Sequence, residues 1–140
     1  MRDALLDAVS SGRLEELRAV MDLNELPPEL GAEPVSEPIK FWRKLSADGT
    51  GADILAALAL VLAQPPVATA LGKDLENTRQ FIWPAFADQP LTSLTPAELD
   101  QLHQLESPAK AAQMIKLGRY TGWRVVIGGD GVWHSFRRYD

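Results

Sequence analysis

The C-terminal part of the chain alternates between apolar and polar residues. The alternation runs over residues 123–127 and again over residues 132–137, and Gly128-Gly129-Asp130-Gly131 separates the two runs. Successive side chains of a β-strand point to opposite faces, and Asp-Gly is a frequent turn between paired strands. The pattern therefore predicts a β-hairpin with one apolar face and one face that carries polar and basic groups.

Earlier residues show the period of an α-helix instead. Apolar residues recur three and four positions apart over residues 5–21, where Ser10-Ser11-Gly12 divides them into two short helices, and again over residues 38–45. Residues 54–63 are apolar on nearly every side, which predicts a helix in the middle of the domain. Two further helical segments are expected, over residues 67–71 and 75–83.

Helix start and stop signals are clearest between residues 95 and 118. Thr95-Pro96-Ala97-Glu98 combines a capping Thr, a Pro at the first helical position and a Glu at the third. Ser107-Pro108 repeats the start signal, and Gly118 stands where a left-handed helix stop is expected. These signals predict one helix from Pro96 and another from Pro108.

Residues 22–37 form a connector between helices, because they are rich in proline and also contain Asn24 and Gly31. We therefore predict a single α+β domain of mainly short helices with a C-terminal antiparallel β-hairpin packed on them. Its parts are an acidic helical hairpin with the connector (1–37), a helical core (38–118) and the β-hairpin (119–140).

Composition restricts the chemistry that is available to the protein. The 140 residues include no Cys and only two His, His103 and His134. Without thiolates, a zinc site would need carboxylates for which the sequence shows no pattern, so we predict no metal site and no cofactor. The glycine-rich segments 48–51 and 128–131 lack the lysine and the strand-to-helix context of a phosphate loop.

The charge of the chain is negative overall and unevenly distributed. The net charge of −5 argues against a general nucleic-acid binder. Residues 1–37 carry three basic and nine acidic side chains, whereas residues 116–140 carry five basic and two acidic ones. The predicted hairpin is therefore the basic end of an acidic protein.

The sequence predicts no transmembrane segment. The longest apolar run, residues 54–63, is about half as long as a membrane-spanning helix requires. The first residues lack the charged-then-apolar pattern of a signal peptide. We expect a soluble protein, either cytoplasmic or exported with a signal peptide that is absent from this chain.

The polar face of the hairpin is the candidate binding surface. A two-residue and a four-residue turn both place Trp133 on this face and His134 on the apolar face, although a bulge in the turn would move Trp133 across. The face concentrates residue types that dominate binding hot spots. The candidate binding residues are Arg124, Trp133, Arg137, Tyr139 and Tyr120. We expect a binding or protein-interaction module whose partner is a protein, a glycan or an anionic ligand.

Two other functions are compatible with the sequence. A small hydrolase-like enzyme would use His134 and a carboxylate as acid and base, although no nucleophile-elbow pattern accompanies them. A structural homodimer would pair the edge strand of the hairpin with a second copy of the chain.

The N-terminal run Leu5-x-x-Ala8, followed by Gly12-x-x-Glu15, resembles one ankyrin-type helix pair. The run does not recur at the ankyrin period of about 33 residues, and roughly three stacked repeats are needed for a stable core. An ankyrin array is therefore excluded, and an ordinary helical hairpin is expected.

Three short motifs carry a second resemblance. They are Phe81-Ile82-Trp83-Pro84, Leu91-x-x-Leu94-Thr95-Pro96, and the ending from Gly122-Trp123-Arg124 to Asp130-Gly131-x-Trp133. Through these motifs, residues 40–140 resemble a group of small uncharacterised bacterial proteins. The resemblance implies a protein of a kind that is often exported, and it implies no activity and no catalytic residues.

Overall fold

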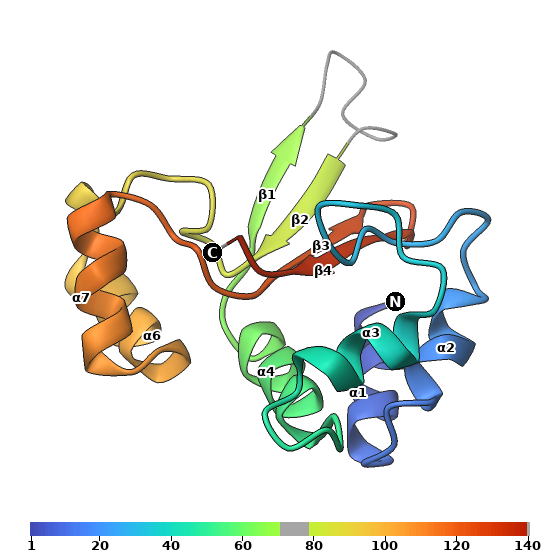
Figure 1. The fold of residues 1–140 in the computed structure, drawn as a ribbon. Coiled ribbons are helices and arrows are strands. Elements are labelled where there is room, and N and C mark those ends of the chain that lie inside the picture. The colour runs from blue at the N-terminus through green and yellow to red at the C-terminus, as the bar shows by residue number, and fades with distance from the viewer. Residues whose placement is uncertain (71–78, 140) are drawn as a thin grey trace.

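The computed structural model describes residues 1–70 and 79–139 of the chain. In this part, four antiparallel strands form one sheet in the order β1-β2-β3-β4. The strands are β1 (Val67–Ala70), β2 (Arg79–Trp83), β3 (Arg124–Gly128) and β4 (Trp133–Arg137). Figure 1 shows helices α1 to α4 gathered on one side of the sheet and helices α6 and α7 packed together apart from them. The predicted α+β fold class is confirmed.

Local sequence signals placed most helices correctly. The helices are α1 (Arg2–Ser10), α2 (Glu16–Met21), α3 (Pro38–Leu45), α4 (Ala52–Leu62), α6 (Pro96–Leu105) and α7 (Pro108–Leu117), with a 3-10 turn η1 at Leu91–Ser93. Thr95 and Glu98 form the predicted capping box at the start of α6. Gly118 ends α7 with a left-handed φ of 87°.

Residues 67–70 and 79–83 are strands, so the prediction of helices there is wrong. β2 pairs with β3, where Phe81 lies opposite Ile127. Side-chain packing against strands that are distant in the sequence outweighs a local helical pattern. The segment 38–118 is therefore not a purely helical core. The remaining residues of the two predicted helices, 71 and 75–78, lie outside the described residues.

β3 and β4 form the predicted hairpin, with one extra residue in β4. Val126 lies opposite Ser135 but Ile127 lies opposite Trp133, so His134 has no partner in β3. Such a β-bulge changes which side chains point to each face of the sheet. As a result Trp133 is buried and His134 is exposed, the opposite of the predicted assignment.

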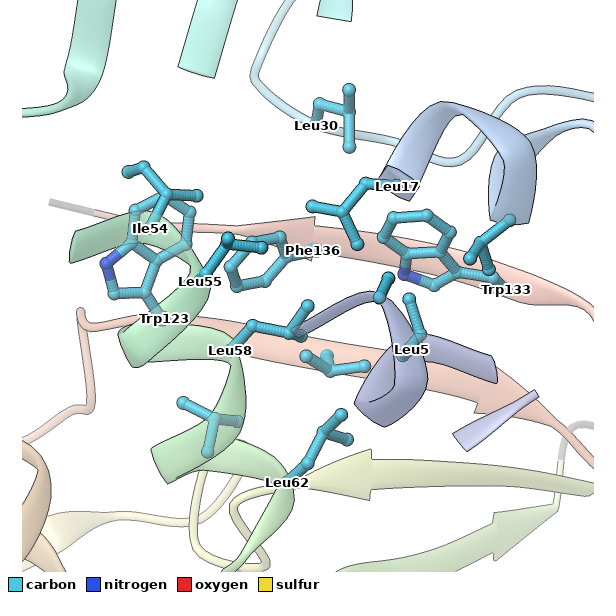
Figure 2. Close-up of a cluster of buried hydrophobic side chains, with 14 of the residues drawn as sticks. Leu5, Leu17, Leu30, Ile54, Leu55, Leu58, Leu62, Trp123, Trp133 and Phe136 are labelled. Carbon is cyan, nitrogen blue, oxygen red and sulfur yellow. The ribbon is translucent and has the colours of Figure 1, made fainter. Parts of the chain in front are cut away.

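The sheet face toward α1–α4 builds a large hydrophobic cluster. Trp123, Phe136 and Trp133 lie in a row along the hairpin, as Figure 2 shows. Leucines of the N-terminal helices cover this row. The leucines labelled there from α1, α2 and α4 are Leu5, Leu17, Leu55, Leu58 and Leu62. The hairpin is thus tied to the N-terminal helices by apolar packing.

A second hydrophobic cluster attaches α6 and α7 to the other sheet face. Ile82 of β2 is buried in this cluster, and Val126 of β3 packs against it. The helices contribute Leu102, Ala111 and Met114. The sheet therefore lies between two clusters, and α6 and α7 pack on the face that carries Arg124 and Arg137.

The apolar helix α4 is buried on one side only. Leu55 and Leu58 are buried in the large cluster, whereas Ala56 is exposed and Leu60 is 46% exposed. The prediction that this helix lies in the middle of the domain is therefore wrong, because one of its faces is exposed.

The connector between α2 and α3 covers the outer edge of β4. The Asn24 side chain donates to Trp133 O (2.7 Å) and accepts from Trp133 N–H (3.2 Å). Glu29 N–H donates to His134 O (2.8 Å), and Phe136 N–H donates to Glu29 O (3.0 Å). A dimer sheet through this edge would have to replace these four hydrogen bonds.

Substitution of Gly51, the residue before α4, tests the packing of the start of α4 against the turn between α1 and α2. Its φ is 82°, and a Cβ there would lie 2.6 Å from Leu14 Cδ2, whereas Gly49 has a φ of 77° with open space around it. The left-handed backbone alone costs an L-residue roughly 1–2 kcal/mol. We expect Gly49→Ala to lower the free energy of unfolding by about that amount and Gly51→Ala to lower it further, as measured by urea unfolding. Equal losses would contradict the contact between Gly51 and Leu14.

Candidate functional site

Trp133 does not belong to an exposed binding face. Its side chain is fully buried and stacks on Trp42 of α3, with ring centroids 6.5 Å apart and an angle of 13° between the planes. The indole Nε1–H donates to Ser135 O (3.0 Å). The expectation of an exposed Trp133 is wrong because the bulge at His134 turns the indole inward.

Arg124 and Arg137 lie opposite each other on the outer face of the hairpin and enclose the ring of Tyr139. The guanidinium carbons lie 4.5 Å and 4.3 Å from the ring centroid. Only 15% and 14% of the two arginine side chains is exposed. The ring attracts both guanidinium groups through cation–π interactions.

A carboxylate compensates the charge of each of these arginines. Arg124 pairs with Asp88 and donates to Ala87 O (2.7 Å), and Arg137 pairs with Glu29. We call this group the arginine clasp; its members are Asp88, Arg124, Tyr139, Arg137 and Glu29. The clasp holds the connector, the loop after β2 and the C-terminal segment against the sheet. Its two arginines therefore stabilise the fold through their ion pairs.

Tyr120, another predicted binding residue, is buried with 2% exposure. Its hydroxyl donates to Trp123 O (2.7 Å), and its ring packs edge-on against Phe86. Burial raises the pKa of Tyr120, and the nearby carboxylate of Glu106 raises it further. The phenol therefore stays neutral and serves as a hydrogen-bond donor within the fold.

His134 lies apart from these residues. Its exposed side chain borders a cavity of about 360 Å³ that connector residues 27–35 line. Glu29, the carboxylate of that segment closest in the fold to β4, is bound to Arg137. Among the described residues, none forms an ion pair with His134. The Asp130 carboxylate and the His134 imidazole both lie beside Gly128 without forming an ion pair, so the enzyme hypothesis stays a prediction.

One side of α7 forms a wall of a cleft of about 290 Å³. Its lining residues in α7 are Lys110, Gln113, Met114 and Leu117, which share one helix face because they follow at helical spacing. The other wall consists of Arg119, Thr121, Arg138 and Tyr139. We call this space the α7 cleft. Tyr139 N–H donates to Thr121 O (3.0 Å) and so holds the second wall together.

The α7 cleft is basic. Lys110, Arg119 and Arg138 line it, and no acidic residue is found among its described lining residues. Lys110 and Arg119 form no ion pair with any described residue. A cleft with charges of one sign and low-dielectric walls concentrates the electrostatic potential. The arrangement can therefore attract and hold an anion.

A cavity of similar size adjoins the α7 cleft. This cavity of about 300 Å³ shares Arg119 and Tyr139 with the cleft and reaches Arg124 and Asp88 of the arginine clasp. The wall of the cleft that contains Arg119 and Tyr139 is thus continuous with the arginine clasp, which ion pairs hold in place.

Sequence reasoning found part of this site. Tyr139 lines the α7 cleft and Arg124 lines the adjoining cavity, whereas Trp133 and Arg137 line neither. Lys110 and Arg119 were missed as site residues. The basic excess over residues 116–140 includes Arg119 and could have indicated it, but only the packing of α7 brings Lys110 to the same cleft.

No protein-family model, curated protein or solved structure matches the chain. Within residues 1–70 and 79–139, none of the helices is long and apolar enough to cross a membrane. In the same part of the chain, no three His, Asp or Glu side chains come together as metal ligands. The geometry and charge of the α7 cleft are therefore the features from which a function can be inferred.

Trp133→Ala and His134→Ala distinguish the bulged register from the regular one. Removing the buried indole should lower the free energy of unfolding by about 3–5 kcal/mol. Removing the exposed imidazole should change it by no more than about 0.5 kcal/mol. Thermal or urea unfolding measures both values. A larger loss for His134→Ala than for Trp133→Ala would contradict the bulge.

Tyr139→Leu tests the arginine clasp. Without the aromatic ring, Arg124 and Arg137 lose their cation–π interactions, so we expect a loss of about 1 kcal/mol in the free energy of unfolding. The loss should be larger at low ionic strength, where repulsion between the two guanidinium groups is less screened. Tyr139→Phe keeps the ring and serves as the control. Equal stabilities for the Leu and Phe variants would show that the ring does not stabilise the clasp.

Proposed function

We propose that the protein is a binding module that captures an anionic ligand in the α7 cleft. The observation that carries this proposal is the presence of Lys110 and Arg119, which form no ion pair with a described residue, in a cleft whose described lining residues include no carboxylate. The whole chain has a net charge of −5, so the charge of this cleft is opposite in sign to that of the protein. An acidic ligand is the partner that such a field selects.

The size of the α7 cleft favours a small ligand. Its volume of about 290 Å³ lies at the lower end of the usual range for ligand sites. Arg119 can hold a carboxylate or a phosphate through two parallel hydrogen bonds, and Lys110 adds a second cation. Gln113 and Thr121 supply neutral hydrogen-bonding groups in the same cleft.

The surroundings of the α7 cleft support binding rather than catalysis. The arginine clasp holds Tyr139, which belongs to one wall, so this part of the site is ordered before a ligand arrives. Such preorganisation reduces the entropy that binding costs. Imidazole and carboxylate groups, the common general acids and bases, are absent from the described lining residues.

The double variant Lys110→Gln/Arg119→Gln tests the proposed function. We expect citrate, used as a tricarboxylate probe, to bind the natural protein at low salt and to bind this variant at least about tenfold more weakly, because two charge-assisted hydrogen bonds are lost. Isothermal titration calorimetry measures both affinities.

Lys116→Gln/Arg18→Gln is the matched control for this titration. It removes one exposed Lys from the same helix and one exposed Arg from α2, and neither residue lines the α7 cleft. We expect this variant to bind citrate like the natural protein. Equal losses in the two double variants would mean that net charge alone governs binding, and the assignment of the cleft would be wrong.

A further inference from the structure

Another cavity, of about 350 Å³, opens between α4, the end of α6 and the segment that leads into β3. Its wall is mainly apolar and includes Ala56, Leu60 and Trp123. Leu60 is 46% exposed, and Leu45, which also lines the cavity, is 50% exposed. We call this space the α4 cavity. Uncovered apolar side chains around a hollow favour an apolar ligand group.

The α4 cavity and the α7 cleft are neighbours. Arg138 lines both spaces, and its guanidinium carbon lies 5.8 Å from the centroid of the Trp123 ring. On the facing segment, Tyr120 lines the α4 cavity and the next residue, Thr121, lines the α7 cleft. Arg138 and the segment 120–121 therefore border both spaces.

The two spaces differ in the sign of their charge. Asp53 and Glu106 line the α4 cavity, and the carboxylate of Glu106 lies against the backbone at Gly122. These carboxylates repel an anionic group, whereas Lys110 and Arg119 attract it into the α7 cleft. The charges therefore determine the orientation of an acidic ligand with an apolar chain: its acidic group would lie in the α7 cleft and its chain in the α4 cavity.

We infer that the ligand is an amphipathic anion, an alkyl chain that ends in a phosphate or a carboxylate. The acidic group lies at Lys110 and Arg119 in the α7 cleft, and the alkyl chain runs past Arg138 into the α4 cavity. There the chain covers Leu60 and the part of Trp123 that lines the cavity, so burial of apolar surface adds to the attraction between charges. This inference rests on the proposed anion binding in the α7 cleft.

Monoalkyl phosphates of increasing chain length test the inference. Methyl, butyl and octyl phosphate present the same acidic group, and they are titrated below the concentrations at which they aggregate. Each methylene group that becomes buried raises affinity roughly fourfold. We expect octyl phosphate to bind at least about tenfold more tightly than methyl phosphate, since several methylene groups enter the α4 cavity.

Two sets of variants locate the two parts of the ligand. Leu60→Ser should reduce the gain from methyl to octyl phosphate and leave methyl phosphate binding unchanged, whereas Leu99→Ser should change neither. Leu99 is the matched control because it is 37% exposed on α6 and lines neither space. Lys110→Gln/Arg119→Gln should weaken the binding of every member of the series.

The outcomes separate this inference from the function on which it rests. If methyl phosphate binds and needs Lys110 and Arg119, but octyl phosphate binds no more tightly, the proposed function stands and the amphipathic ligand is wrong. If octyl phosphate binds equally well with and without Lys110 and Arg119, the two spaces do not hold one ligand, and the inference is overturned. If neither citrate nor any alkyl phosphate binds, the proposed function fails and this inference fails with it.

Discussion

The extra residue in β4, at His134, determines which side chains the sheet presents to the helices. With it, Trp123, Phe136 and Trp133 all lie on the inner face of the hairpin, and Trp133 stacks on Trp42 of α3. The connector that precedes α3 then forms hydrogen bonds along the outer edge of β4. The arrangement of the N-terminal helices and of the connector therefore depends on the register of a hairpin at the other end of the chain.

The same bulge removes Trp133 from the outer face of the hairpin. Arg124, Arg137 and Tyr139 pack on one another at this face, and carboxylates from two other segments compensate the arginines. Positive charge without such compensation lies beside this clasp, at Lys110 and Arg119 in the α7 cleft. The face that looks like a binding surface in the sequence thus stabilises the fold, and ligand binding is proposed for the neighbouring cleft.

The sequence predicted the parts of the fold that depend on interactions between residues close together in the chain. Capping by Thr95 and the stop at Gly118 gave the ends of α6 and α7, and the alternation of apolar residues gave the hairpin. β2 was missed because it pairs with β3, which is distant in the sequence, and β1 was missed with it because β1 pairs with β2. The bulge was not fixed by the sequence because several turns fit its glycine-rich loop. For the candidate site, the basic excess over residues 116–140 indicated the segment that contains Arg119. Only tertiary packing brings Lys110 into the same cleft.

Hydrogen exchange at the indole N–H of Trp133 tests the bulged register most directly. This group is buried and donates to Ser135 O, so it should exchange only when the whole protein unfolds. NMR should then give it the same free energy of opening as the backbone amide of Leu58, which lies in the same cluster. Exchange of the Trp133 indole far faster than that of Leu58, under conditions in which the protein stays folded, would contradict the account.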